Sequence, residues 1–227
     1  MPQQVPGDVG EAITAIDRRE LTASSFGKTS KWPRTTRRQQ RIAGVLRRRQ
    51  PDLTVVLENV HDPHNVSSVL RTCDAVGVLG VHIIYTDEEA PTRPFARTTS
   101  ASATKWIETT RYASVEECYG ALRQQGFTIL ATAFETDAQD LYEIDLCRPT
   151  ALVFGNEMRG VSEEAVAKAD GHVLIPMLGM VQSLNISVAC AVTLYEAMRQ
   201  RREAGHYSGA KLADAELQRL QEAWEVK

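Results

Sequence analysis

The sequence predicts an α/β protein with a mainly parallel sheet that is covered by helices on both faces. Short runs rich in Val, Leu and Ile alternate along the chain with segments of helical periodicity. These runs are apolar almost throughout, which is typical of parallel strands buried on both faces. Polar clusters directly follow three of the runs, and ligands of such sheets bind outside the carboxyl ends of the strands.

The first predicted helix spans residues 35–49, with Ile42, Val45 and Leu46 on one face. Pro51 ends this helix, and a strand follows at 53–57. The next helix spans 65–76, because apolar side chains recur there at helical spacing. Asn65 is its predicted N-cap.

Further strands are predicted at 81–85, 127–131, 150–154 and 172–175. A polar loop at 91–104 precedes a helix at 115–125, which Gly126 closes. A short helix at 162–169 has Ser162 as its N-cap and two glutamates in its first turn, where negative charge is favourable. A long helix at 183–203 and an amphipathic helix at 213–226 complete the pattern.

Length and composition fit one substantial core. The chain has 227 residues, of which 43% are hydrophobic and 24% are charged. No apolar run approaches the roughly 20 residues that cross a bilayer, and the N-terminus lacks the order of a secretory signal. The cysteines have no paired spacing: Cys73, Cys118, Cys147 and Cys190. We therefore expect a cytoplasmic protein with reduced thiols and no metal or membrane partner.

Positive charge is concentrated near the N-terminus, although the net charge is −3. Nine basic residues and no acidic one lie between Lys28 and Arg49, a pattern typical of binding to nucleic-acid phosphates. A second basic cluster lies at 199–202, where a solvated helix face is the plainer interpretation of the cluster taken alone. The residues expected to contact the nucleic acid are Arg38, Arg41, Arg48, Arg49, Arg199 and Arg201.

The first polar cluster runs from residue 58 to Arg71. Arg71 interrupts the predicted helix beside its apolar stripe, where a guanidinium can fork onto a phosphate or a carboxylate. A surface ion pair with Asp74 or another carboxylate is the plainer alternative for Arg71. The asparagine at position 65 has a plainer role too, since an N-cap alone explains it.

The second and third clusters lie at 154–160 and 176–185. In the second, Gly155 follows a strand directly, where the backbone turns sharply or approaches another group closely, and Glu157 stands at the mouth of that strand. The third carries Ser183 and Asn185, in an apolar-polar loop that suits an adenine ring and a ribose better than a triphosphate. Neither a Walker A sequence nor a dinucleotide-binding glycine signature is present.

Together the segments 48–55, 58–78, 154–164 and 175–189 resemble the motifs of the SpoU branch of the SPOUT RNA methyltransferases. The resemblance covers residues 37–207. It implies a deep trefoil knot around 150–200, S-adenosylmethionine as the cofactor, and a homodimer with its active site at the interface. The run 48–54 and the extended third motif resemble the tRNA enzymes, which implies 2′-O-methylation of tRNA at guanosine 18 of the D-loop.

The resemblance also implies roles for single residues. Arg71 matches the catalytic arginine and Asn65 the asparagine of the first motif. Because the pKa of arginine lies above about 12, we expect Arg71 to hold the RNA phosphate and assist proton removal. The polar residues of the second and third motifs are matched by Glu157, Ser183 and Asn185. We expect Asn65, Ser183 and Asn185 to set the geometry. Residues implied to contact the cofactor, largely through backbone, are Thr132, Gly155, Ile175 and Leu184.

The expected domains are a partly mobile arm at 1–34, a basic RNA-binding helix at 35–50, a methyltransferase domain at 51–205 and a C-terminal helix at 206–227. Two other functions stay open: an rRNA 2′-O-ribose methyltransferase of the same fold, and a non-catalytic RNA-binding module. A dinucleotide-dependent enzyme is disfavoured by the missing glycine signature.

Overall fold

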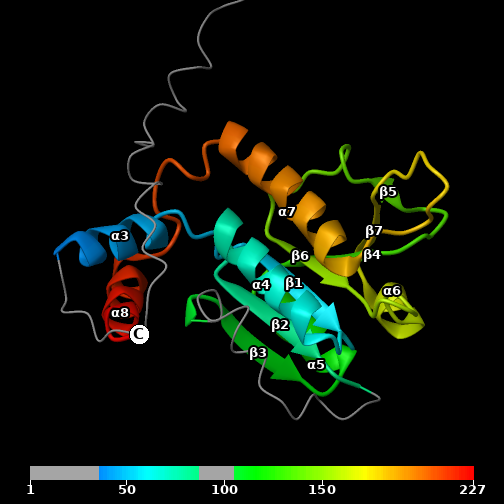
Figure 1. The fold of residues 1–227 in the computed structure, drawn as a ribbon, viewed down its shortest axis with the longest axis horizontal. Helices are drawn as coiled ribbons and strands as arrows, with labels where there is room; N and C mark the ends of the chain where they lie inside the picture. The colour runs from blue at the N-terminus through cyan, green and yellow to red at the C-terminus, as the bar shows by residue number, and fades with distance from the viewer. Residues whose placement is uncertain (1–35, 87–104) are drawn as a thin grey trace, which may run out of the picture. The chain divides into compact units, whose positions relative to one another are not determined.

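The structure, a computed structural model, describes residues 36–86 and 105–227 (Figure 1). The predicted arm at 1–34 and the predicted polar loop at 91–104 lie outside these residues. Within the two described ranges, none of the helices has the length and hydropathy that would carry it through a bilayer.

The described strands form one parallel sheet of seven strands in the order β3-β2-β1-β6-β4-β7-β5. Their bounds are β1 Leu53–Glu58, β2 Gly80–Ile84, β3 Glu108–Tyr112, β4 Thr128–Thr132, β5 Gln139–Asp140, β6 Thr150–Phe154 and β7 Gly171–Leu174. Strands β1 and β6 pair along their length at the centre of the sheet, and every residue of both is buried. The five predicted strands are therefore confirmed, and their observed bounds differ from the predicted ones by no more than one residue.

Strands β3 and β5 were not predicted. The side chains of β3 are almost all exposed, since this strand lies at the edge of the sheet and pairs with β2 alone. It therefore lacks the apolar run that marks a buried strand. Strand β5 has only two residues, which is too short for any sequence pattern.

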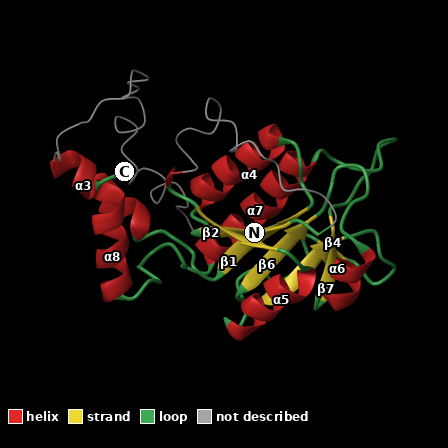
Figure 2. Ribbon diagram, turned by 90° about the horizontal axis from the view of Figure 1, so that it is seen from below, coloured by secondary structure: helices red, strands yellow, loops and turns green. Residues whose placement is uncertain are grey.

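Helices cover both faces of the sheet, as predicted. Their bounds are α3 Thr36–Leu46, α4 Pro63–Val76, α5 Val115–Gln124, α6 Glu163–Lys168, α7 Ile186–Glu203 and α8 Asp214–Glu225. Helices α4 and α7 pack on one face and α5 and α6 on the other, as Figure 2 shows. The knot expected around 150–200 stays a prediction.

Two helix starts differ from the sequence prediction. Helix α4 begins at Pro63, and its N-cap is Asp62, whose side chain accepts a hydrogen bond of 2.9 Å from the His64 backbone N–H. Proline suits the first helical position because its missing N–H would be unpaired there anyway. The prediction of Asn65 as N-cap was therefore wrong. Helix α7 begins at Ile186 with Asn185 as N-cap, so Ser183 lies in the preceding loop.

The basic helix α3 and the C-terminal helix α8 pack against each other although they are far apart in sequence (Figure 1). Their shared apolar cluster is built from Ile42, Leu46, Leu220 and Trp224. Helix α3 ends at Leu46, three residues earlier than predicted, because the chain turns inward there and buries Arg49.

Candidate active site

A cavity of about 340 Å³ lies where β4, β6 and β7 end. Each of these strands is followed by a loop that contributes to the lining, as expected for the carboxyl edge of a parallel sheet. The lining includes all four residues that were predicted to contact the cofactor, Thr132, Gly155, Ile175 and Leu184. It also includes Glu157 and Ser183, so the cavity brings together six of the nine residues predicted for catalysis and cofactor binding.

Gly155 is required by the close fold of its own loop. A Cβ atom at this position would lie 2.0 Å from the Gly160 carbonyl oxygen and 2.2 Å from the Val161 nitrogen. The loop turns back on itself through a hydrogen bond of 2.8 Å from the Gly160 N–H to the Asn156 carbonyl. The close backbone approach that the sequence suggested is therefore confirmed.

Two contacts tie this loop to the end of β1. The buried carboxylate of Glu58 accepts hydrogen bonds from the Ser162 backbone N–H at 2.9 Å and from its hydroxyl at 2.5 Å. The Asn156 side chain donates to the Asn59 carbonyl at 2.9 Å. Sequence reasoning gave no role to Glu58 or Asn156; a carboxylate at the end of an apolar strand was the available signal.

Asn65, Glu157 and Asn185 form a hydrogen-bonded chain at the edge of the cavity. The Asn65 amide donates to Glu157 Oε1 at 2.7 Å, and the Asn185 amide donates to Asn65 Oδ1 at 3.2 Å. Asn185 Oδ1 in turn accepts from the Ser187 backbone N–H at 2.9 Å and from the Ser187 hydroxyl at 2.6 Å.

The backbone sets the direction of this chain. A backbone N–H only donates, so the Asn185 oxygen must face the start of α7 and its amide nitrogen must face Asn65. Asn65 then turns its oxygen to Asn185 and its nitrogen to Glu157. The N-cap of α7 therefore leaves the Glu157 carboxylate as the acceptor at the far end.

Arg71 lies on the exposed side of α4, six residues beyond Asn65 and about 9 Å further along the helix axis. It is not among the residues that line the cavity. The carboxylate of Asp74, one of the alternative partners considered for Arg71, pairs with Arg49 at 2.5 Å. Among the described residues, no cluster of three His, Cys, Asp or Glu side chains is arranged to hold a metal ion.

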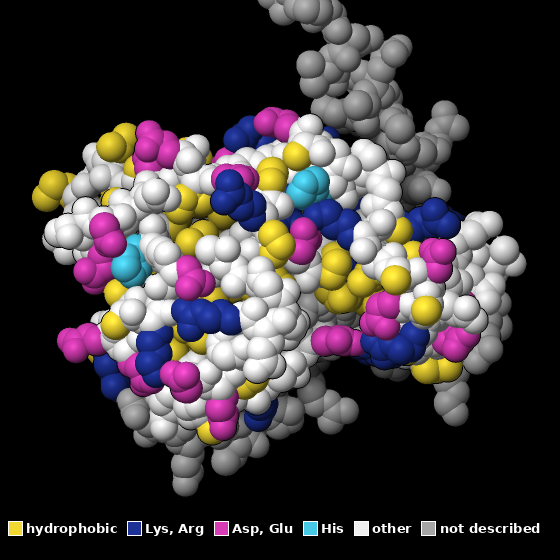
Figure 3. Space-filling view, turned by 180° about the vertical axis from the view of Figure 1, so that it is seen from behind, with side chains coloured by type: hydrophobic (Ala, Val, Ile, Leu, Met, Phe, Trp, Pro, Cys, Tyr) yellow, Lys and Arg dark blue, Asp and Glu magenta, His cyan; other side chains and the backbone are white. Residues whose placement is uncertain are grey.

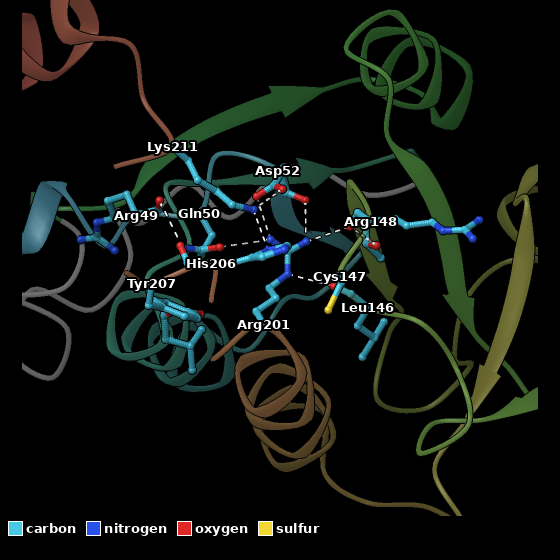
Figure 4. Close-up of polar contacts among 12 residues, drawn as sticks. Arg49, Gln50, Asp52, Leu146, Cys147, Arg148, Arg201, His206, Tyr207 and Lys211 are labelled. Carbon is cyan, nitrogen blue, oxygen red and sulfur yellow. Dashed lines mark hydrogen bonds and ion pairs between the residues drawn. The ribbon is translucent and has the colours of Figure 1, made fainter. Parts of the chain in front are cut away.

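Two arginines predicted to contact RNA are fully buried, which corrects that assignment. Arg201 donates to Asp52 Oδ1 at 2.7 Å and to the carbonyls of Leu146 and Arg148 at 2.9 and 2.8 Å (Figure 4). Arg49 donates to the Val78 carbonyl at 2.7 Å besides its pair with Asp74. A fully buried guanidinium cannot reach a phosphate.

The network around Arg201 also changes the ionisation of Asp52. Burial alone would raise the pKa of Asp52, but hydrogen bonds from Lys211 and Arg201 and the charges of both cations outweigh it, so the pKa lies below its usual value. Lys211 reaches the second carboxylate oxygen at 2.6 Å. The network thus joins the segment just before β1 to α7 and to the segment before α8.

The remaining predicted RNA contacts differ in their surroundings. Arg41 and Arg48 are exposed on or just after α3, whereas Arg38 is half-buried and donates to the Glu225 carbonyl. Arg199 is 53% exposed and pairs with Glu196 and Glu203. Figure 3 shows the face with α5 and α6, where basic and acidic side chains are interspersed. There Lys168 pairs with Glu116 and Glu164.

Comparison with known proteins identifies the family. The model of the SpoU rRNA Methylase family matches residues 52–195. The chain belongs to the SpoU methylase family. This SpoU methylase is 52% identical to a tRNA (guanosine(18)-2′-O)-methyltransferase of Thermus thermophilus, over 84% of this chain and 97% of that protein.

Solved structures of family members are similar as well. A TrmH/SpoU tRNA modifying enzyme from A. aeolicus matches with a TM-score of 0.77 and 39% identity, over 83% of this chain and 95% of that chain. The SpoU methyltransferase AviRb from Streptomyces viridochromogenes, in complex with the cofactor AdoMet, matches with a TM-score of 0.59 and 27% identity, over 68% of this chain and 59% of that chain. The predicted α/β fold and family are confirmed.

Proposed function

We propose that this SpoU methylase transfers a methyl group from S-adenosylmethionine to the ribose 2′-hydroxyl of guanosine 18 in tRNA. The observation that carries the proposal is the cavity at the ends of β4, β6 and β7, in which the predicted cofactor residues converge beside Glu157. The substrate follows from the relative in Thermus thermophilus, which the chain matches over nearly that protein's whole length. We place the reaction in the cytoplasm, with the tRNA.

The cavity residues fit the proposed cofactor. Its volume of about 340 Å³ lies in the range of about 300–1,000 Å³ that small-molecule sites occupy. Ile175 and Leu184 offer apolar surface for an adenine ring, while the backbone at Gly155 offers polar groups that no side chain covers. When bound, S-adenosylmethionine supplies an electrophilic methyl group. This chain supplies binding and orientation.

In this proposal, Arg71 and the hydrogen-bonded side chains of Asn65 and Asn185 act on the RNA. A guanidinium binds a phosphate through two parallel hydrogen bonds, which would fix the ribose next to it. Asn65, Asn185 and Ser183 set the geometry around that ribose. Orientation of this kind supplies several kcal/mol of a reaction barrier.

Exposed arginines of the basic helix bind the tRNA backbone in this proposal. Arg41 and Arg48 are exposed, although Arg48 Nε donates to the Gly44 carbonyl at 3.0 Å. Arg38 and Arg199 are less available, because Arg38 is half-buried on Glu225 and Arg199 pairs with two carboxylates. Contacts with phosphates release counterions, so log K should fall linearly with log salt. Arg41→Ala and Arg48→Ala should each reduce the slope by about one. A salt-independent affinity would contradict phosphate binding.

The protein is further proposed to act as a homodimer. Val188 and Tyr195 lie seven residues apart on one face of α7 and are 46% and 50% exposed. Three apolar side chains of the loop before α7 are also exposed: Leu178, Met180 and Val181. Exposed apolar surface of this extent is typical of an interface. Sedimentation should give a dimer for the native chain and a monomer for Tyr195→Glu.

Methyl transfer to purified RNA tests the function. We expect labelled methyl to enter a tRNA transcript at position 18, and a transcript with deoxyguanosine at that position to accept none. Transfer to rRNA instead of tRNA would favour the rRNA enzyme of the same fold. A protein that binds tRNA but not S-adenosylmethionine would be a non-catalytic RNA-binding module.

A further inference from the structure

Arg49 is a fully buried cation at the junction between the basic helix and the sheet. It lies three residues beyond the end of α3 and four residues before the start of β1. Its guanidinium donates to Asp74 Oδ1 at 2.5 Å and to the Val78 carbonyl at 2.7 Å. The same guanidinium lies 5.0 Å from the centroid of the Trp224 ring. One side chain therefore contacts α8, the last turn of α4 and the segment before β2.

Helices α3 and α8 form a pair with apolar contacts of its own. The cluster that they share is distinct from the two clusters on the faces of the sheet. Figures 1 and 2 both show the pair beside the sheet and not on one of its faces. The exposed arginines proposed to bind tRNA, Arg41 and Arg48, lie on or just after α3, whereas Arg71 lies on α4. The orientation of the α3–α8 pair relative to α4 therefore decides whether all three arginines reach one RNA.

The surroundings of Arg49 favour a role in orientation. Asp74 lies three residues beyond Arg71 on α4, so the ion pair ties the α3–α8 pair to the helix that carries Arg71. The Arg49 Nε makes no hydrogen bond to the described residues, although a buried donor without a partner costs stability. Buried ion pairs are often no more stable than apolar residues of similar volume, and some of them instead select one arrangement of the chain. The incomplete hydrogen bonding of Arg49 fits this second role.

We propose that Arg49 is a positioning residue for tRNA binding. Through Trp224 on one side and Asp74 on the other, it holds the α3–α8 pair in the orientation that joins the arginines of α3 and Arg71 into one RNA-binding surface. A surface that is already ordered binds without the cost of ordering it. Loss of these contacts therefore weakens the binding of tRNA and leaves the reaction of bound tRNA unchanged. This inference rests on the proposed function.

Arg49→Met tests this role, because methionine keeps an unbranched side chain in the buried site and removes the charge and its donors. The Kd for full-length tRNA, measured by fluorescence anisotropy, should rise about tenfold. The Kd for S-adenosylmethionine and the single-turnover rate at saturating tRNA should each stay within about threefold of the native values. An unchanged Kd for tRNA, or an equal loss of cofactor affinity, would overturn the proposal. If Arg49→Met does not fold, the same criteria apply to Asp74→Asn, whose side chain is 34% exposed.

A pair of variants separates positioning from independent action on the RNA. Arg41→Ala should weaken tRNA binding in the native protein. In the Arg49→Met protein the same change should alter the Kd by less than about twofold, because a displaced α3 no longer places Arg41 on the RNA. Full additivity of the two changes would overturn the proposal. A native protein that binds no tRNA would overturn the proposed function as well, whereas additive changes in a tRNA-binding protein overturn the positioning role alone.

Discussion

Replacing Arg201 with alanine should destabilise the fold strongly without touching the active site. The guanidinium is fully buried and donates to five acceptors in the network of Figure 4. These acceptors are Gln50 Oε1, Asp52 Oδ1 and the carbonyls of Asp52, Leu146 and Arg148. Because they belong to the segments just before β1 and β6, the side chain holds the end of α7 against the sheet.

The expected cost follows from the groups that lose a partner. Thr150 still donates to the carbonyls of Asp52 and Arg148, and Lys211 still pairs with the Asp52 carboxylate. The Leu146 carbonyl loses its donor, which costs about 1–3 kcal/mol. Gln50 Oε1 loses a longer hydrogen bond of 3.3 Å, which adds less. The charged hydrogen bond to Asp52 is worth about 1.5–3 kcal/mol. The sum of about 2.5–6 kcal/mol agrees with the roughly 3–5 kcal/mol found when one partner of a buried pair is removed.

Urea unfolding followed by circular dichroism measures this change, and Arg199→Ala is the control. Arg199 lies two residues earlier on the same helix but is 53% exposed, and its partner Glu203 is exposed too. Its other partner, Glu196, is buried, but it still accepts a hydrogen bond of 2.8 Å from Gln200 when Arg199 is removed. The removal of Arg199 should therefore cost about 1 kcal/mol, well below the cost at Arg201. Arg201→Ala should also lower the melting temperature by about 5–20 °C. Equal destabilisation by the two variants would refute the reasoning.

The same pair of variants tests whether Arg201 contacts RNA. Below its unfolding transition, Arg201→Ala should bind tRNA with an unchanged salt slope, because a buried guanidinium releases no counterion from a phosphate. A slope reduced by about one would restore the RNA contact that the sequence suggested for Arg201.

Three further predictions concern the cofactor loop, the RNA site and a surface pair. Gly155→Ala should weaken S-adenosylmethionine binding by about tenfold or more in calorimetry, since the added Cβ meets the Gly160 carbonyl at 2.0 Å and the loop must move; unchanged affinity would contradict the loop's role. Arg71→Ala and Arg71→Lys should both abolish methyl transfer while cofactor affinity is retained, because lysine lacks the planar fork; turnover by either would refute the phosphate role. Burial alone would lower the pKa of His172, but hydrogen bonds to the Val166 carbonyl and to Asp137 raise it above its usual value. The protonated pair therefore stabilises the fold below about pH 6.5 and loses this contribution as pH rises through the folded-state pKa. Asp137→Asn should lower the melting temperature more at about pH 5.5 than at about pH 9, and the opposite order would contradict the sign.

Apolar runs and capping residues along the sequence predicted the buried strands and one of the helix starts. The almost wholly apolar runs at 53–57 and 150–154 became the two central strands, because burial on both faces favours apolar side chains. The polar exceptions, Thr54 and Thr150, are buried and donate their hydroxyls to backbone carbonyls. Ser162 was recognised as an N-cap, and its hydroxyl accepts a hydrogen bond from the Ala165 N–H. The edge strand β3 was missed, since its exposed residues carry no burial pattern.

The sequence by itself determined the sheet, the helices on its faces, and the position of three polar loops at the carboxyl ends of strands. Periodicity and capping act over a few residues, so they can be read along the chain. Tertiary structure alone decided that Arg201 serves the core, because its partner Asp52 is 149 residues away. Tertiary structure alone also decided the direction of the hydrogen bonds from Asn185 through Asn65 to Glu157, since Asn185 and Asn65 are 120 residues apart. Charge and residue type are properties of a position, whereas burial and hydrogen-bond direction depend on which distant segment the fold brings beside it.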